Sequence, residues 1–314
     1  MEKKKVTKHT IKDLYGNISD YLIRHKEENK KITGIVFSNE GSKGREPLFD
    51  VSFGQTNDIF AYWEDEKKGI ICVSAEKPGY EVRAPKNMRQ FFQAWYRSNF
   101  SITYLDVTHL DVSKTTNFSN CFTDFGWNMK KPGTMVPARI VGLETWNISN
   151  GFCFDSMFFG AFPGNESVDL NLSGWKIDSE YRQSFRGMFY NFAPNANEVV
   201  LNVSGWDMHG AKNLSTMFKL FAPKAKNVKI YGIEDWRLGI GNICLSQTFE
   251  RCASVSEYYL DLSNWTEKCN LKPDMDRFAT GTFLKSKNRF GKIIRRRKMA
   301  KNKVTKHVLG RSWN

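Results

Sequence analysis

No run of eighteen consecutive apolar residues occurs in the sequence, so a transmembrane helix is not expected. The basic segment MEKKKVTKHT at residues 1–10 is followed by no apolar stretch, so a standard secretion signal is not expected either. We therefore expect the protein to reside in the cytoplasm or to be associated with a virion.

Residue patterns typical of catalytic and metal sites are also missing. The six cysteines form no Cys-x-x-Cys pair, and none of the five histidines lies at metal-ligand spacing from another ligand. No phosphate-binding loop occurs, and GIGN at 239–242 lacks the third glycine of a dinucleotide site. We predict a protein that is not an enzyme and needs no cofactor or metal.

Acidic residues are absent from residues 285–314, which contain twelve of the lysines and arginines. This segment therefore carries +12 of the net charge of +14. A polycation of this kind favours anionic partners through counterion release. We predict that nucleic acid, anionic lipid, an acidic protein or an anionic assembly binds here, with the densest charge at Lys292, Arg295, Arg296, Arg297 and Lys298.

What the sequence does contain is a repeat marked by tryptophan. Successive gaps of 29, 31, 30 and 29 residues separate Trp146, Trp175, Trp206, Trp236 and Trp265. A fixed period of this size indicates a stack of similar units. We expect the five indoles to pile onto one another inside one elongated body, since a single unit cannot bury its own apolar face.

Each unit has the same internal order. An alternating segment such as LNLSGW predicts a half-buried strand that ends at the tryptophan. A phenylalanine follows twelve to fourteen residues later and another ring three or four residues after that, which predicts a short helical turn. A proline, as in FPGN and FAPN, ends the turn. Leu110 occupies the tryptophan position one unit upstream, and Phe91–Phe92 begin the frame.

Cysteine and asparagine recur within this frame. Cys121 and Cys252 occupy positions that methionine or phenylalanine holds elsewhere, so we interpret them as core residues. A disulfide between adjacent coils is the alternative. Several Asn-x-Ser/Thr triplets, for example at Asn171 and Asn202, resemble glycosylation sites, but they recur because the repeat itself reads N-[LV]-S.

The segments LDLSNW, NMRQFF, DSMF and STMF resemble the leucine-rich repeats of BspA-like bacterial surface proteins, the mycoplasma lipoprotein-type repeat. IFAYWEDEKKGIICVSA resembles the segment before the first repeat in that family. The resemblance covers roughly residues 58–283 and implies a leucine-rich-repeat fold and a role in adhesion or protein binding. The units here are longer than the usual leucine-rich repeat, and the secretion signal and cell-wall anchor of the family are not seen.

We therefore predict an α+β fold in three parts. Residues 1–57 form a small α+β cap, with an amphipathic helix over 10–27 and strands at KITGIVFS and LFDVSF. Residues 58–283 form a leucine-rich-repeat-like solenoid of about six strand and short-helix coils. Residues 284–314 form the basic tail. An insertion at 126–141 interrupts the solenoid. A loop that breaks a regular stack is a reasonable place for function, and a tolerated excursion without a function explains it equally well.

The candidate binding surface is the ladder of strands. Positions two and four residues before each tryptophan position are expected to face outward and to stack into a polar ribbon that binds an extended partner, or else to be a solvated sheet face. The residues are Asp106, Thr108, Glu144, Asn171, Ser173, Asn202, Ser204, Glu234, Asp261 and Ser263.

Three hypotheses of function follow. The first is a non-enzymatic interaction protein that binds a protein or glycan on the solenoid, with the tail anchored to an anionic partner. The second is a structural component of a large assembly such as a phage virion. The third, and the weakest, is a cryptic enzyme with its site on the insertion.

Overall fold

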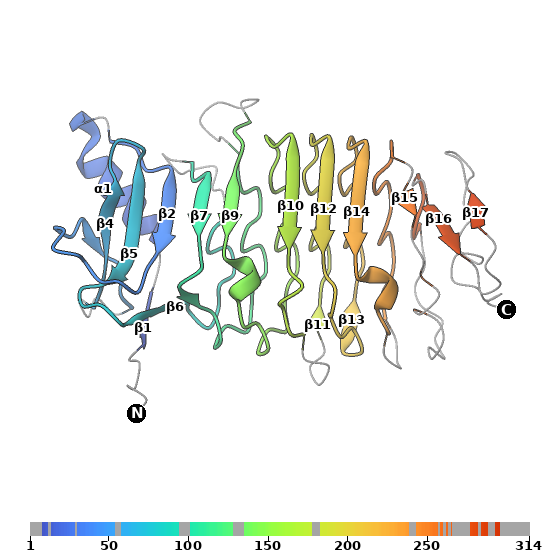
Figure 1. The fold of residues 1–314 in the computed structure, drawn as a ribbon, viewed down its shortest axis with the longest axis horizontal. Coiled ribbons are helices and arrows are strands. Elements are labelled where there is room, and N and C mark those ends of the chain that lie inside the picture. The colour runs from blue at the N-terminus through green and yellow to red at the C-terminus, as the bar shows by residue number, and fades with distance from the viewer. Residues whose placement is uncertain are drawn as a thin grey trace.

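Strands account for most of the regular structure, and they follow one another along an elongated body (Figure 1). The computed structural model of the chain describes residues 8–11, 14–28, 30–53, 58–93, 101–127, 135–177, 183–238, 243–256, 258–259, 262, 265, 277–281, 284–287 and 293–295. Within these residues the protein is a β-solenoid of about four turns with a single α-helix. No helix in this part of the chain has the length and apolar character needed to span a membrane.

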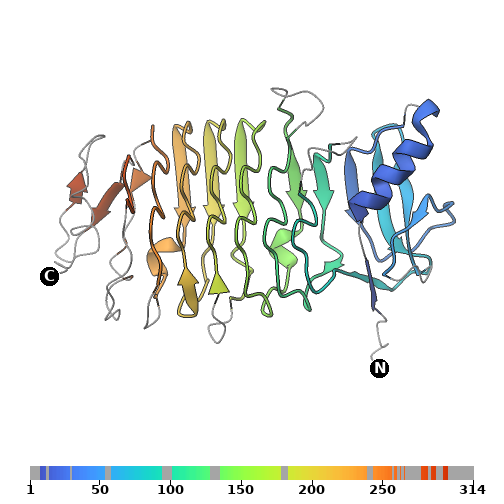
Figure 2. The ribbon, with the colours of Figure 1, turned by 180° about the vertical axis from the view of Figure 1, so that it is seen from behind.

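The single α-helix, α1 (Leu14–Arg24), confirms the helix expected over residues 10–27. It buries Leu14, Ile18 and Tyr21, which recur at helical spacing on one face. Figure 2 shows the helix lying across strands at the N-terminal end of the body, and a 3₁₀ turn, η1 (Lys26–Glu28), follows it.

The N-terminal strands and the first solenoid strands share one six-stranded sheet, in the order β3-β4-β5-β2-β7-β9. Both strands expected in this region form, and the segment that resembles the family's pre-repeat region folds as the β4–β5 hairpin. β3, from the predicted cap, pairs with β4, from the predicted solenoid, so residues of both predicted regions belong to one sheet. The strands are β2 (Gly34–Phe37), β3 (Phe49–Asp50), β4 (Ile59–Asp65), β5 (Ile70–Ala75), β7 (Tyr104–Asp106) and β9 (Arg139–Val141).

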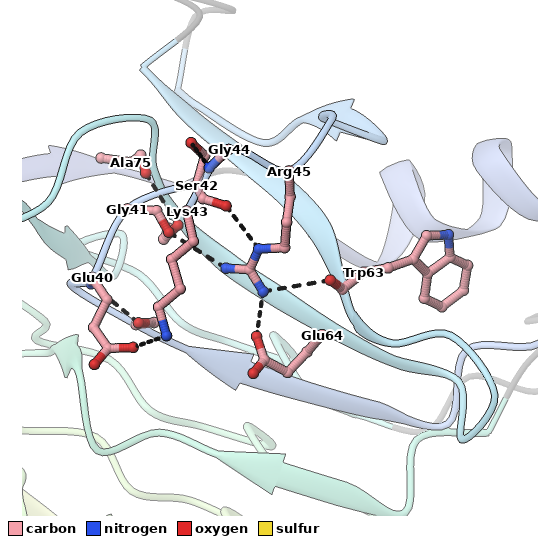
Figure 3. Close-up of polar contacts among 11 residues, drawn as sticks. Glu40, Gly41, Ser42, Lys43, Gly44, Arg45, Trp63, Glu64 and Ala75 are labelled. Atoms are coloured by element: carbon pink, nitrogen blue, oxygen red, sulfur yellow. Dashed lines mark hydrogen bonds and ion pairs between the residues drawn. The ribbon is translucent and has the colours of Figure 1, made fainter.

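An arginine fixes the loop that joins β2 to β3. Arg45 donates to the carbonyls of Gly41, Ser42 and Trp63 and pairs with the Glu64 carboxylate (Figure 3). Its guanidinium lies 5.5 Å from the centre of the Tyr62 ring. The planar guanidinium has several N–H groups, so it can bond to the loop and to β4 at the same time and hold the two together.

The remaining strands extend the body toward the C-terminus. β10, β12 and β14 form a parallel sheet, which together with β7 and β9 is here called the front layer. Each residue pairs with the one beside it: Ser167 with Glu198 between β10 and β12, and Asn202 with Tyr231 between β12 and β14. Short strands β1, β6, β11 and β13 lie in the lower part of Figure 1, and β8 pairs with β6. The bounds are β1 (Lys8–Thr10), β6 (Glu81–Arg83), β8 (Leu110–Asp111), β10 (Ser167–Asn171), β11 (Gln183–Ser184), β12 (Glu198–Asn202), β13 (Ala211–Asn213) and β14 (Asn227–Tyr231).

A continuous stack of aromatic rings forms the core, as the tryptophan spacing predicted. Neighbouring indoles lie 5.6–6.4 Å apart with interplanar angles of 0–14°. A second, parallel stack runs from Phe92 through Phe122, Phe158, Phe189 and Phe218 to Phe249 at centroid distances of 5.1–5.6 Å. Cys121 and Cys252 are fully buried beside these rings and are free thiols, which confirms their interpretation as core residues.

Four of the five indoles are also held by hydrogen bonds. The Nε1–H groups of Trp146, Trp175, Trp206 and Trp265 each donate to a main-chain carbonyl of the preceding coil, at 2.7–3.3 Å. Stacking therefore buries each of these four large rings without leaving its N–H group unpaired.

The short helical turn expected after each tryptophan does not form, and this prediction was wrong. The chain returns behind the front strands as a series of turns, here called the returning turns (residues 153–162, 184–193, 213–222 and 244–253). Amides there alternate in direction: Phe189 donates to Met217 of the next coil, whereas Met188 donates three residues back to Phe185. A helix would direct every amide along its own axis, and it would leave neighbouring coils unpaired.

Left-handed glycines let two coils accommodate an extra turn. Gly142 (φ 90°) and Gly232 (φ 89°) precede the 3₁₀ turns η2 (Leu143–Thr145) and η3 (Ile233–Asp235). A Cβ on Gly232 would lie 2.3 Å from the Cα of Ser204 in the coil before it. Glycine is therefore required here both for its backbone angle and for the close approach of two coils.

We expect Gly232→Ala to lower the free energy of unfolding by roughly 3 kcal/mol, because strain and overlap act together. Gly205→Ala is the matched control, since Gly205 also has positive φ (81°) but has only one atom within 4 Å, at 3.8 Å. That variant should lose about 1 kcal/mol from the backbone angle alone. Urea unfolding followed by circular dichroism measures both, and equal losses would show that the coils do not meet closely at Gly232.

The C-terminal region contains further strands. β15 (Tyr258–Tyr259) pairs parallel with β16 (Leu284–Lys287), and β16 pairs antiparallel with β17 (Ile293–Arg295). The first residues of the predicted tail thus pair with the end of the solenoid, and residues 296–314 lie outside the described part. The count of six coils, the α+β designation and the capping role of residues 1–57 remain predictions.

Candidate functional site

The outward side chains of β10, β12 and β14 form one surface, here called the front face, which no other described residues of the chain cover. Alternate residues of each strand, such as Val168 and Leu170, are buried or, at Val228, half-buried, and the residues between them point outward. Pairing in register aligns the outward residues in three columns across the strands. The columns are Ser167, Glu198 and Asn227; Asp169, Val200 and Lys229; and Asn171, Asn202 and Tyr231.

The front face mixes charge, amide groups and one large ring. Asp169 and Lys229 are exposed at the two ends of the middle column, and Tyr231 is 45% exposed at the end of the lower one. Asn227 donates to the Glu198 carboxylate at 2.9 Å, so part of the upper column is already ordered. In the described part of the chain α1 lies at the far N-terminal end and does not cover these strands (Figure 1).

The predicted ladder residues lie at the lower ends of the strands. Asp106, Asn171 and Asn202 end β7, β10 and β12, and their side-chain oxygens accept main-chain hydrogen bonds of 3.0–3.1 Å from the residues two positions on. The donors are Thr108, Ser173 and Ser204, which lie beyond the strand ends. These side chains bend the chain by Asx turns.

The same turn explains the Asn-x-Ser/Thr triplets. Asn147 and Asn213 accept main-chain bonds from Ser149 and Ser215 in the same way. The triplet recurs because asparagine at the first position and a small polar residue at the third stabilise the corner of each coil.

The other predicted ladder residues do not join these. Glu144 and Glu234 lie in the 3₁₀ turns η2 and η3. Asp261 and Ser263 lie outside the described residues. Of the predicted set, Asn171 and Asn202 are direct neighbours, whereas Asp106 pairs with Val141.

The predicted anionic-partner site falls mostly beyond what the structure describes. Arg295 lies on β17, and Lys292, Arg296, Arg297 and Lys298 lie outside the described residues. The function of this segment remains a prediction.

A crevice separates β9 from β10 within the front layer. The crevice opens to solvent and has a volume of about 690 Å³. Among the described residues β9 is the last strand of one sheet and β10 the first strand of the next, and the two strands do not pair. Its walls combine polar side chains with an apolar floor. The lining includes Tyr104, Arg139, Ile140, Glu144, Phe162, Asn165, Ser167, Val168, Asp169 and Leu170.

The crevice lies where the sequence predicted an insertion. Trp127 and Met135 form an antiparallel bridge at the base of the inserted loop, and residues 128–134 lie outside the described part. The Trp127 indole donates to the Gly160 carbonyl at 3.1 Å, so it anchors the loop. The insertion therefore accompanies a break in the regular pairing of strands.

Apart from Asn171 and Asn202, the outward residues of β10, β12 and β14, among them Asp169, Lys229 and Tyr231, were not among the residues predicted from the sequence. The signal was present, because SVDLN and NVKIY alternate apolar and polar residues. The predicted frame was instead anchored on the tryptophan, whereas each strand ends four or five residues before it.

Half-buried Asp124 lies beside Gly160, near the start of the insertion, and its carboxyl group has a raised pKa. Its carboxylate occupies the space above Gly160, where a Cβ would lie 2.3 Å from Oδ1. Burial raises the pKa of Asp124 to about 6. The folded chain therefore binds more protons than the unfolded chain between about pH 4 and 6, and its stability falls as pH rises through this window.

We expect Asp124→Asn to stabilise the protein by about 1–2 kcal/mol at pH 8, after allowance for partial solvation. At pH 4 the carboxylate is largely protonated in the folded chain, so the variant and the parent should differ little. Thermal unfolding from pH 4 to pH 8 tests this. A stabilisation that does not change with pH would contradict the account.

Burial also affects three cysteine thiols in the described part. Burial raises the pKa of the Cys72 thiol, although the Arg45 guanidinium acts in the opposite direction. Burial likewise raises the pKa values of Cys121 and Cys252, so these thiols stay protonated at neutral pH. Within the described residues no group of three or more histidine, cysteine or acidic side chains could hold a metal ion.

No protein-family description, curated protein or solved structure matches the chain.

Proposed function

We propose that the protein is a non-enzymatic interaction protein that binds a protein or glycan partner through the front side of its solenoid. The observation that carries this proposal is the front face itself, with three columns of outward side chains in register on parallel strands. Parallel sheets are ordinarily covered on both faces, so an open one is available to a partner.

The stacked core supports this role by holding the front face rigid. Rings pack continuously under β10, β12 and β14, from Trp175 to Trp236. The columns repeat at the strand spacing of about 4.8 Å. A surface that is already ordered before binding loses little conformational entropy when a partner binds, which favours association.

Residue types on the front face suit recognition. Tyr231 offers an exposed ring with a hydroxyl, and tyrosine is enriched among residues that dominate binding energy. Asp169 and Lys229 carry opposite charges in one column, which would orient a charged partner. The resemblance of the repeats to BspA-like surface proteins supports protein binding or adhesion.

The basic segment supports a second contact in the same proposal. Residues 285–314 would anchor the protein to nucleic acid, anionic lipid, an acidic protein or an anionic assembly. Binding of this kind should weaken steeply with salt, because each contact releases counterions.

The test screens the full chain against a glycan array and a peptide display library, and then measures affinity for the selected ligand. We expect Lys229→Glu combined with Tyr231→Ala to weaken binding at least tenfold. Arg186→Glu reverses an exposed cation on the returning turns and is the matched control, expected to bind normally. Equal losses in both variants, or no ligand selected by the folded chain, would refute the front-face proposal.

A separate measurement tests the anchor. The full chain and a variant with Arg295, Arg296 and Arg297 changed to glutamine are compared on DNA, RNA and anionic vesicles over a range of salt concentrations. We expect the variant to bind more weakly and with a shallower salt dependence. Identical binding of the two proteins at every salt concentration would remove the anchoring half of the proposal.

A further inference from the structure

The β9–β10 crevice interrupts an otherwise continuous parallel layer. On one side β9 pairs with β7, and on the other β10 pairs with β12 over five residues. Deeper in the body the stack is unbroken, since Trp146 and Trp175 lie 6.4 Å apart and the Trp175 indole donates to Leu143 at 2.7 Å. The opening is therefore confined to the strand layer.

Main-chain groups on both walls face into the crevice. The Arg139 amide donates to the Thr103 carbonyl, and the Val141 carbonyl accepts from the Val107 amide. The main-chain groups of Arg139 and Val141 therefore point toward β7. Successive residues of a strand direct their N–H and C=O groups to opposite sides, so Ile140 faces β10. On the other wall the Leu172 amide donates to Asn202 on β12.

The main-chain groups also alternate in direction along β10. The N–H and C=O groups of Val168 and Leu170 point to β12, as those of Leu172 do. The main-chain groups of the residues between them, Ser167, Asp169 and Asn171, therefore face β9. Within the described residues no main-chain hydrogen bond links this edge to β9. Two strand edges thus face one another, and their main-chain donors and acceptors are unpaired among the described residues.

A side-chain amide already acts as a peptide group at the crevice. Asn165 accepts from the Ala138 amide and donates to the Ala138 carbonyl, both at 2.9 Å. At the corresponding steps of the next coils the main chain pairs directly, for example from the Asn197 amide to the Glu166 carbonyl. A carboxamide has the donor and acceptor of a peptide bond, so Asn165 replaces main-chain pairing between the segments just before β9 and β10.

The lower end of the crevice is closed. A Cβ on Gly174 would lie 2.4 Å from the Glu144 carbonyl, so the coils meet there. The walls carry exposed charges of both signs, Arg139 on β9 and Asp169 on β10. Ile140 and Leu170 supply apolar contacts between them.

We propose that the β9–β10 crevice binds an extended polypeptide segment, whose main chain pairs with the exposed edges of β9 and β10. Strand addition is an established mode of peptide recognition, in which main-chain bonds supply affinity and side chains supply specificity. A segment with an acidic residue opposite Arg139 and a basic residue opposite Asp169 complements the rims. This inference rests on the proposed function and names the partner's chemical class.

The probe is a synthetic peptide with the consensus that the full chain selects from a random dodecapeptide display library. Ser167→Pro removes an amide that faces the crevice, and proline is tolerated at the first residue of an edge strand. Ser167→Ala is the matched control because it keeps the amide. We expect at least tenfold weaker binding for the proline variant and an unchanged affinity for the alanine variant, with both folds verified by circular dichroism.

Two measurements do not depend on the folding of a variant. Methylation of alternate amide nitrogens of the peptide should weaken binding at least tenfold for one of the two alternating sets. Bound peptide should also slow hydrogen exchange at the amides of Ile140, Ser167, Asp169 and Asn171. Unchanged affinity of both methylated sets, or unchanged exchange at these amides, would overturn the proposal.

The outcomes separate this inference from the proposed function. A peptide that loses affinity with Lys229→Glu and Tyr231→Ala but not with Ser167→Pro would place binding on the front face and overturn the crevice proposal alone. Selection of glycans and no peptides would also overturn it. Loss with Ser167→Pro but not with the front-face variant would leave the crevice as the site and refute the front face.

Discussion

Trp206→Ala is expected to lower the free energy of unfolding by about 4 kcal/mol, because it empties a position in the middle of the indole stack. The Trp206 indole is 4% exposed and lies between Trp175 and Trp236 at 5.8 and 6.0 Å. Its removal would leave a cavity lined by rings that cannot close around it, because each is held by its own coil. It would also leave the Leu172 carbonyl without its indole donor.

Trp206→Phe is the matched control. It keeps a ring in the stack but loses the hydrogen bond of 2.9 Å to Leu172, so a loss of about 1–2 kcal/mol is expected. Far-UV circular dichroism in urea follows both variants without relying on tryptophan fluorescence. Similar losses for alanine and phenylalanine would show that ring stacking at this position contributes little.

Lys219→Met is expected to cost about 3 kcal/mol, because it leaves a buried carboxylate with one cation fewer. Glu250 is 2% exposed, with Lys219 Nζ 3.0 Å from one oxygen and Arg277 bonded to the other. The half-exposed Arg277 is the only other cation paired with Glu250 in the described residues. Methionine keeps most of the lysine stem beside the Tyr190 ring, so packing changes little.

A double-mutant cycle separates the charge from the packing. Lys219→Met together with Glu250→Met removes both charges of the pair, and we expect it to recover most of the loss. Lys226→Met, at an exposed lysine, should change stability by less than about 0.5 kcal/mol. If the double variant were as unstable as the sum of the single variants, the coupling between Lys219 and Glu250 would be negligible.

The sequence was informative wherever one residue type recurs at one depth in every coil. Tryptophan at a period near 30 predicted the indole stack, because identical side chains stack when coils repeat. The recurring phenylalanines form a second stack for the same reason, but their spacing was interpreted as a short helical turn. The N-terminal helix and the strands at KITGIVFS and LFDVSF were also predictable, from periodicity alone.

The returning turns were not predictable from ring spacing. Two rings separated by three residues, such as Phe189 and Phe192, suit a helix, but they also suit a turn with left-handed residues such as Asn191 (φ 53°). The choice depends on whether amides bond within the turn or to the next coil, which is a property of the stack. A single unit of sequence does not contain that information.

The candidate site was predictable only in part. The insertion at 126–141 signalled an irregular place in the stack, but the resulting gap between β9 and β10 depends on how neighbouring coils fit together. The outward residues Asp169 and Lys229 follow from strand alternation, whereas Asn171 and Asn202 proved to be committed to Asx turns.

The crevice and the limits of the front face both depend on the break between β9 and β10. Residue-resolved hydrogen exchange of the free chain detects this break, because paired amides exchange slowly and unpaired ones quickly. We expect slow exchange at Val168, Leu170 and Leu172 and fast exchange at Ser167, Asp169 and Asn171, alternating along one strand. Uniformly slow exchange along β10 would mean that β9 and β10 are paired, and it would contradict the account.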